Sequence, residues 1–300
     1  MSNLLYGLLC VLFILFSITL FLIHRVRYPR RSSYNPSGIE GVETIDDLPW
    51  PYEEVTISGH GAVAIAGWFV PAQKKSNKCL VLVHGHRKNK IQMLCHAKYL
   101  REEGYSLLLL DMRHHGNSED GPYALGAFTR WDIKKAVAWL QEREETKDCQ
   151  YGAFGISIGG TSLIAAALDG VPFQCVIADS PSANQAETLA DYGAILYKVP
   201  RFLSRLLLSL IMALAKVDFS PMLLEERSFS AAVPLLLLHG TEDSRVPLHH
   251  SERLAALAKK DNATLVTFVE ADHVGSYESD EKKYRQSVLT FLRKHMPIMG

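Results

Sequence analysis

A serine between two glycines is the first feature of this chain with chemical meaning. Residues 155–159 read Gly-Ile-Ser-Ile-Gly, between a short apolar run and a helical pattern. A nucleophile on a sharp strand-to-helix turn needs small neighbours two residues away on each side, and Gly155 and Gly159 supply that room. The plainer alternative is a turn in which Ser157 only caps the helix. We predict that Ser157 is a nucleophile.

A serine hydroxyl needs a base, and the base needs an anion that orients it. His273 follows the last predicted strand, and Asp243 follows the strand before it. Both positions also suit plainer roles, as an exposed loop histidine and a turn carboxylate, and Glu242 is an adjacent competitor for the acid. The chain order of serine, acid and histidine favours a catalytic triad of Ser157, His273 and one of these two acids.

Two backbone amides are candidates for an oxyanion hole. Ile158 begins the helix after the serine, and His86 follows Gly85 at the end of an apolar strand. We expect Gly85 to permit a tight turn at that point. Both N–H groups are then expected to face the oxygen that becomes negative when the serine attacks a carbonyl group.

Histidines occur in three pairs, which raises the question of a metal centre. No pair has the spacing of a helical H-E-x-x-H motif, and no cysteine joins one. The five cysteines are odd in number and form no C-x-x-C pair, which indicates free thiols. We therefore predict neither a metal nor an organic cofactor. The pairs are His84/His86, His114/His115 and His249/His250, and the cysteines are Cys10, Cys79, Cys95, Cys149 and Cys175.

The start of the chain differs from the rest in composition, because it is almost entirely apolar. Residues 4–23 contain no charged side chain and no proline, and as a helix they would extend about 30 Å, the thickness of a bilayer hydrocarbon core. A signal peptide needs a basic start and small residues at its end, and both are missing here. We predict a transmembrane anchor at 4–23, with a cleaved signal and a buried core helix as the alternatives.

Four arginines follow the apolar run directly, and the segment 24–51 is predicted to be a basic juxtamembrane segment and linker. Excess basic residues mark the cytoplasmic side, so we expect a single-pass membrane protein whose catalytic domain is cytoplasmic. The same side chains could bind anionic headgroups. Lys plus Arg and Asp plus Glu both number 32, so no global basic field predicts a nucleic-acid partner. The arginines are Arg25, Arg27, Arg30 and Arg31.

From residue 52 to 297 apolar strands alternate with helical patterns. Continuous apolar strands of this kind predict an α/β fold with a mostly parallel sheet covered by helices on both faces. Ligands of such sheets bind at the carboxyl ends of the strands, which is where the candidate residues lie. We predict strands at 55–57, 62–70, 80–83, 106–110, 152–154, 175–178, 234–238 and 264–269, and helices at 91–103, 129–144, 158–168, 248–259 and 281–295.

Five motifs, in this order, resemble the α/β-hydrolase superfamily, specifically its membrane-anchored serine hydrolases of the Bem46/serine aminopeptidase-like group. The resemblance covers roughly residues 55–295 and implies the α/β-hydrolase fold. It also implies Ser157 as nucleophile, Asp243 as the triad acid and His273 as the base, with the amides of His86 and Ile158 as the oxyanion hole. Two positions depart from the pattern and bear on substrate preference: His114 replaces a usual glycine, and His86 a frequent apolar residue. The motifs are His84-Gly85, 111–118, 155–159, 239–247 and Asp272-His273.

The alternation of strands and helices is interrupted over about 181–230. The resemblance indicates that this segment is a lid insertion. Pro200 suits a helix start, and residues 202–217 are strongly apolar. Sixteen residues that include Arg205 are short for a second membrane span. An apolar lid beside an apolar anchor favours an acyl chain met at a membrane surface. The alternative is a helix simply packed on the domain.

These features predict a serine hydrolase that cleaves a carboxylic ester or thioester through an acyl-enzyme. The expected substrate is a small ester or acyl compound, and membrane lipid is the expected partner. A peptidase or amidase with the same triad is an alternative, and so is a non-catalytic binding protein on this fold. The sequence sets no oligomeric state, acyl length or leaving group.

Overall fold

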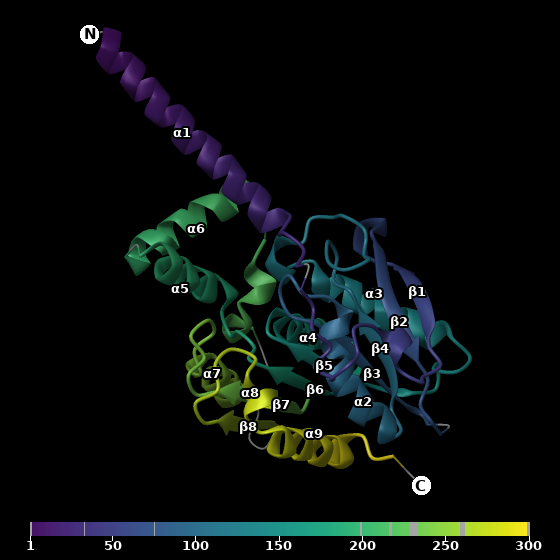
Figure 1. Ribbon diagram of the computed structural model, residues 1–300. Helices are drawn as coiled ribbons and strands as arrows, with labels where there is room; N and C mark the ends of the chain where they lie inside the picture. The colour runs from purple at the N-terminus through teal and green to yellow at the C-terminus, as the bar shows by residue number, and fades with distance from the viewer. Residues whose placement is uncertain are drawn as a thin grey trace.

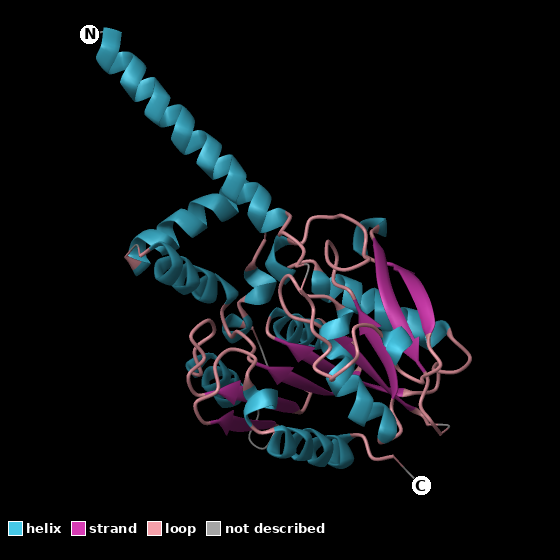
Figure 2. Ribbon diagram, in the orientation of Figure 1, coloured by secondary structure: helices cyan, strands magenta, loops and turns pink. Residues whose placement is uncertain are grey.

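The computed structural model describes residues 2–32, 34–74, 76–198, 200–215, 218–227, 233–258 and 262–298. Its centre is an eight-stranded sheet in the order β1-β2-β4-β3-β5-β6-β7-β8 (Figures 1 and 2). β1 and β2 form an antiparallel hairpin, β2 also pairs antiparallel with β4, and the six strands from β3 to β8 are parallel. The strands are β1 (Glu53–Ser58), β2 (Ala64–Val70), β3 (Lys78–Val83), β4 (Ser106–Leu110), β5 (Gln150–Ile156), β6 (Phe173–Asp179), β7 (Leu235–Gly240) and β8 (Ala263–Phe268).

Helices cover both faces of this sheet, so the central strands are apolar over most of their length. On one face Val81 and Val83 of β3 pack in a core with α3 (Thr129–Glu142) and α4 (Ile158–Leu168). On the other face Leu80 and Leu82 pack with α2 (Leu94–Glu102) and α9 (Glu281–His295). The predicted α/β class with a mostly parallel sheet is confirmed.

Most predicted elements appear within two residues of their expected ends. β4, α4 and α9 have the predicted bounds. The predicted helix 91–103 begins with a 3-10 turn (Lys90–Met93) before α2. The helix predicted over 248–259 is α7 (His249–Leu257), and Lys259 lies outside the described residues. A short helix that was not predicted, α8 (Ser276–Ser279), follows the loop after β8.

The lid insertion contains two helices where one was predicted. α5 (Gln185–Tyr197) and α6 (Arg201–Ala215) pack against each other, and two 3-10 turns, Ser220–Met222 and Leu224–Glu226, lead back toward β7. α5 begins at Asn184, whose side chain accepts a hydrogen bond from the amide of Glu187. α6 corresponds to the predicted helix 202–217, of which residue 217 lies outside the described residues.

The first helix, α1 (Ser2–Arg27), projects away from the domain (Figure 1). It is long and apolar enough to cross a membrane over residues 5–27, and a signal sequence would pass the same test. The segment that follows, predicted to be a juxtamembrane segment and linker, packs along the domain. Arg31 donates to the carbonyl of Ser118 and to Asp120, and Ile45 is fully buried.

Candidate active site

Ser157 lies on a strained turn between β5 and α4. Its φ of 53° and ψ of −121° are unusual for a residue with a side chain. A Cβ atom on Gly155 would lie 2.5 Å from the amide nitrogen of Gly160, and one on Gly159 would lie 2.5 Å from the carbonyl oxygen of His84. The two glycines are therefore needed for steric room. The Ser157 amide donates to the Asp179 carbonyl at 2.7 Å, which fixes the turn to the neighbouring strand.

The three predicted side chains meet above the carboxyl ends of β5, β7 and β8. The Nε2 atom of His273 lies 3.0 Å from Oγ of Ser157, and its Nδ1 atom lies 2.7 Å from Oδ2 of Asp243. Both distances are those of hydrogen bonds. Ser157 and His273, which are 116 residues apart in the chain, thus belong to one continuous relay of hydrogen bonds. Ser157 lies at the end of this relay and is partly exposed.

Asp243 is held as an anion. Burial acts to raise the pKa of its carboxyl group, but hydrogen bonds from His239, His273 and the amide of Val246 outweigh burial and lower that pKa. The amide of Arg245 also donates to Oδ1 at 3.0 Å. Glu242, the competing acid, is exposed and makes no contact with His273 within the described residues.

His239 begins the motif 239–247, and the structure adds a supporting role that was not predicted for it. Its Nε2 atom lies 2.7 Å from the Val246 carbonyl oxygen and 3.3 Å from Oδ2 of Asp243, and its Nδ1 atom lies 2.7 Å from Oγ of Ser251. The ring is fully buried. It therefore fixes the loop that carries Asp243. The sequence feature that could have indicated this role is the position of His239 directly after the apolar run of β7.

Asp179 and Tyr284 form a second buried group beneath the triad. Asp179 ends β6, accepts a hydrogen bond from Tyr284 at 2.8 Å and one from Ser180 at 3.0 Å, and burial raises the pKa of its carboxyl group. Ser180 Oγ also accepts the amide of Val274, the residue after His273, at 3.3 Å. This group ties the histidine loop to the sheet. Tyr284 lies 105 residues away from Asp179, so local sequence carried no sign of the contact.

The two predicted oxyanion donors lie on adjacent turns, because β3 and β5 are neighbouring parallel strands. Ile158 begins α4, where its amide has no carbonyl partner within the helix. His86 follows Gly85 after β3. Gly85 begins the expected turn, in which the Lys88 amide donates to the Gly85 carbonyl oxygen at 3.2 Å, but this turn does not require a glycine. The φ of Gly85 is not in the left-handed region, and an added Cβ would meet only ordinary contacts of 3.4 Å or more.

The loop before the donor turn is organised by His84. The Met112 amide donates to its Nε2 atom at 3.0 Å, so its Nδ1 atom carries the proton and lies 2.7 Å from the Gly85 carbonyl oxygen. Burial lowers the pKa of His84 to about 4, which keeps the ring neutral. The ring thereby joins the ends of β3 and β4.

The motif at 111–118 has a structural role next to this loop. Asp111 is fully buried and accepts the Lys90 ammonium at 2.6 Å and the Asn117 amide at 2.8 Å. A Cβ on Gly116 would overlap the Asp111 carboxyl group. His114, which replaces a usual glycine, does adopt a left-handed φ of 61°. None of these side chains bonds to Ser157 or His273 in the described part of the chain.

Two of the histidine pairs meet, because the ring centroid of His115 lies 5.3 Å from that of His84 and 6.0 Å from that of His86. Among the described residues, the only group with metal-ligating potential is Glu187, His249 and His250, whose ligand atoms lie within 4.8 Å of one another. The Glu187 carboxylate already pairs with Arg253 at 2.8 Å, so a cation there would compete with a guanidinium. All five cysteines are free.

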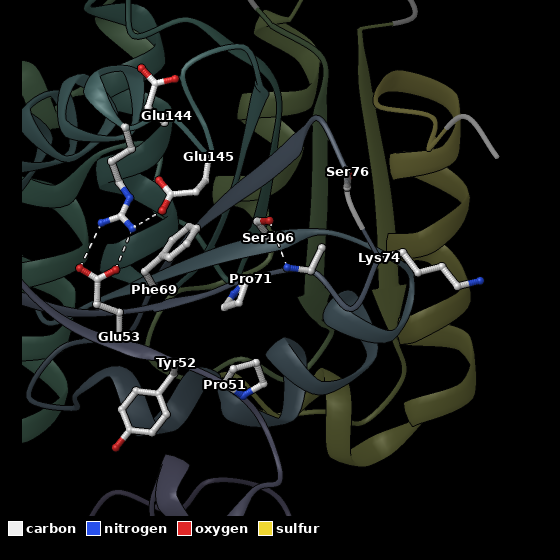
Figure 3. A pocket seen from close by; sticks show the side chains of 12 residues that line it. Pro51, Tyr52, Glu53, Phe69, Pro71, Lys74, Ser76, Ser106, Glu144 and Glu145 are labelled. Carbon is white, nitrogen blue, oxygen red and sulfur yellow. Dashed lines mark hydrogen bonds and ion pairs between the residues drawn. The ribbon is translucent and has the colours of Figure 1, made fainter.

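A surface groove lies at the opposite end of the sheet from the triad. Figure 3 shows it beside Ser106 at the start of β4 and Pro71 just after β2, with Arg143 bonded to Glu53 at its edge. The triad follows the carboxyl ends of the parallel strands, whereas this groove follows their amino ends. It is therefore separate from the candidate active site.

Comparison with known proteins places this site in a family. The sequence model of the prolyl oligopeptidase family matches residues 93–298, which include all three triad positions. The chain belongs to the prolyl oligopeptidase family. This member is 26% identical over 305 residues to protein YfhR of Escherichia coli (strain K12), covering 94% of this chain and 93% of that protein. It is also 26% identical over 196 residues to human protein ABHD12B, covering 64% of this chain and 53% of that protein.

A solved structure similar to this prolyl oligopeptidase family member is the Pyrococcus furiosus esterase Pf2001. It has a TM-score of 0.69 at 25% identity and covers 87% of this chain and 100% of that chain. The predicted membership of the α/β-hydrolase superfamily is confirmed, and the chain is a hydrolase of that superfamily. The narrower Bem46-like grouping is not confirmed and stays a prediction.

Proposed function

We propose that this chain is a membrane-anchored serine hydrolase that cleaves a carboxylic ester or thioester carrying an acyl chain. The observation that carries the proposal is the continuous relay from Asp243 through His273 to Oγ of Ser157, at 2.7 and 3.0 Å. This is the arrangement that turns a serine hydroxyl into a nucleophile. The likeness to a solved esterase supports an ester substrate.

The proposed reaction runs in two halves. Oγ of Ser157 bonds to the carbonyl carbon while Nε2 of His273 takes its proton, and His273 then gives the proton to the leaving alcohol or thiol. Water, deprotonated by the same ring, next breaks the acyl-enzyme and releases the acid. Asp243 stabilises the imidazolium that forms in each half, which its lowered pKa allows throughout the neutral pH range.

The amides of His86 and Ile158 are the proposed donors to the oxyanion. The adjacency of the two turns supports this assignment: Val83 pairs with Gly155 across β3 and β5. The N-terminus of α4 adds the positive end of a helix dipole at the same point. His84, which fixes the turn before His86, is a positioning residue in this scheme.

α1 is the proposed membrane anchor. None of its apolar window is buried among the described residues, and the helix leads away from the domain. The basic residues at its carboxyl end, Arg25 and Arg27, support a catalytic domain on the cytoplasmic side.

A panel of substrates tests the proposed activity. Purified protein is given p-nitrophenyl esters from acetate to long acyl chains, an acyl thioester and an aminoacyl amide, beside the Ser157→Ala variant. We expect ester or thioester hydrolysis that increases with chain length, and loss of about 10³-fold or more in the variant. Unchanged hydrolysis in Ser157→Ala would remove the mechanism, and a steep preference for acetate would remove the acyl chain.

The family match favours one second candidate. Prolyl oligopeptidase family membership is consistent with a peptidase or amidase, because the same triad serves both bond types. In that case the aminoacyl amide is the preferred member of the panel and the esters are turned over without chain-length preference.

A further inference from the structure

The lid helix α6 exposes its apolar face. Four large apolar side chains at intervals of four residues form a stripe along its outer side, which we call the α6 stripe: Phe202, Leu206, Leu210 and Leu214, with exposed fractions of 73, 64, 52 and 53%. Spacing by four keeps successive side chains on one side of a helix. The inner side packs on the protein through Ser204 and Ile211, which are both buried. An amphipathic helix in water normally has the reverse arrangement.

Charged residues of α6 lie away from the stripe and attach the helix to the lid. Arg201 pairs with Asp191 at 3.0 Å, and Arg205 lies 3.5 Å from Glu187, both acids being on α5. The helix has 15 residues, or about 22 Å, against about 30 Å for a hydrocarbon core. It is therefore too short to span a bilayer and has the features of a helix that lies in the interface plane.

α6 lies against α1, so the exposed stripe adjoins the apolar anchor. The two helices are in contact, and Figure 1 shows α6 crossing beside the end of α1 nearest the domain. Met212 of α6 and Val26 of α1 both pack on the same side of the main core. If α1 crosses a bilayer, α6 lies at the depth where that bilayer meets water.

Unpaired cations gather near the same end of α1. Arg87 donates to the Arg30 carbonyl at 3.1 Å and accepts the Ser32 amide, which holds its loop against the segment after α1. Arg30, Arg87 and Arg245 are exposed. Within the described ranges none of these three has a carboxylate within ion-pair distance. Cations beside an apolar stripe are the features of a surface that binds anionic lipid.

We propose that α6 lies in the interface of the bilayer that α1 crosses, with the α6 stripe among the acyl chains. The inference rests on the proposed anchor and deepens the proposed function, because the lid begins beside the nucleophile. The Ser182 amide donates to Oγ1 of Thr161 in α4, and α5 starts three residues later. The substrate class is then an ester or thioester of a membrane-resident amphiphile.

Depth-dependent quenching tests the position of α6 in the full-length chain. Cys10→Ala and Cys149→Ser remove the two accessible thiols, since the other three are buried. A nitrobenzoxadiazole label is attached at Leu210→Cys, and the protein is reconstituted into phosphatidylcholine/phosphatidylglycerol vesicles containing lipids with doxyl groups on their acyl chains. The matched control is Leu257→Cys on α7, another exposed leucine, at 40%.

We expect acyl-chain doxyl groups to quench the label at Leu210 about threefold more strongly than the label at Leu257. Equal quenching at the two positions overturns the proposal. Absence of quenching with concentration-dependent cross-linking through position 210 also overturns it, because the stripe then binds a second copy of the chain.

A charge pair on the stripe separates this inference from the proposed activity. Leu206→Glu with Leu210→Glu is expected to slow hydrolysis of a long-chain ester in vesicles about tenfold, while hydrolysis of soluble p-nitrophenyl butyrate stays within about twofold. Leu257→Glu should change neither rate. If the unmodified protein hydrolyses both substrates and the double variant keeps its vesicle activity, only the membrane role of α6 is wrong. If the unmodified protein hydrolyses neither, the proposed function itself is wrong.

Discussion

The carboxyl end of the sheet and the anchor–lid region follow opposite rules. At the sheet end, polar groups are buried and hydrogen-bonded to one another, as Asp243 is to His273 and Asp179 is to Tyr284. In the anchor–lid region, apolar groups are exposed along α1 and the α6 stripe. The first arrangement is complete within the chain, because these buried groups are hydrogen-bonded to one another. In the second arrangement, the exposed apolar side chains are shielded from water only if an apolar medium surrounds them.

The comparison separates the residues proposed for catalysis, which are mostly buried, from the residues proposed for membrane localisation, which are exposed. A buried relay tolerates almost no change, because removing one partner leaves another unsatisfied. An exposed apolar face tolerates changes in water and matters only where its medium is present. The following predictions test each side of the comparison, from the largest expected effect to the smallest.

Asp243→Asn should give the largest effect, on the sheet-end side. Loss of the charge leaves the His273 imidazolium without a counterion and favours the wrong tautomer, so kcat for a soluble ester should fall about 10³- to 10⁴-fold with KM little changed. Glu242→Gln, next to it and exposed, is the control and should keep kcat within about twofold. Steady-state kinetics of both variants measure this, and similar losses in the two would show that the acid has been assigned to the wrong residue.

Acid should destabilise the buried end of the sheet. Burial lowers the pKa of three histidines there. Between pH 6.5 and 4 these histidines bind protons in the unfolded chain but not in the folded chain, so the free energy of unfolding falls as pH falls. Burial raises the pKa of Asp179, which acts in the opposite direction. Each proton that the unfolded chain binds in excess corresponds to about 1.4 kcal/mol of unfolding free energy per pH unit. The histidines are His84, His96 and His115, with pKa values of about 4, 3 and 2.

Urea unfolding in detergent at pH 7, 6 and 5, followed by tryptophan fluorescence, measures that slope. A midpoint that does not move between pH 6 and 5 would contradict the view that these rings are buried and neutral.

Two motif glycines should respond differently to alanine, which sharpens the account of the sheet end. Gly159→Ala forces a Cβ against the His84 carbonyl and should cost about 2 to 3 kcal/mol of unfolding free energy, with a large loss of ester hydrolysis. Gly85→Ala has room and should cost less than about 1 kcal/mol. Denaturant midpoints of the two variants measure the contrast. Equal costs would mean that the turn geometry described for one of them is wrong.

The smallest effect is expected on the anchor–lid side. Leu210→Gln should change the unfolding free energy by less than about 0.5 kcal/mol in a lipid-free short-chain detergent, because its side chain is already half exposed. Leu163→Ala, in the fully buried face of α4, should cost about 2 to 5 kcal/mol under the same conditions. Thermal unfolding of both compares the regions directly, and a large loss at Leu210 would show that the stripe is covered by protein.

Sequence predicted the sheet end better than the lid for a physical reason. Ser157, Asp243 and His273 lie in short motifs whose spacing relative to strands is fixed by local sterics, so their meeting could be expected. The roles of Asp179 and Tyr284 were missed because their contact joins positions 105 residues apart in the chain, and His239 was named in a motif without a role. α5 was missed because its apolar pattern is weak, and Gly193 within it has its role only against Ser204 of α6.

The direction of the α6 face could not be predicted either, because the pattern of residues 202–217 is equally typical of a buried helix. The segment 24–51 was predicted to be a linker from its composition, which carried no sign that Ile45 and Arg31 pack on the domain.

Labelling with a fluorophosphonate probe tests the central claim, that the relay makes the Ser157 hydroxyl reactive. The full-length protein is treated with the probe, digested and analysed by mass spectrometry. The account predicts one adduct, on Ser157, which is lost in Ser157→Ala and strongly reduced in His273→Gln. Absence of labelling in the unmodified, folded protein, or labelling that survives in His273→Gln at the same rate, would contradict it.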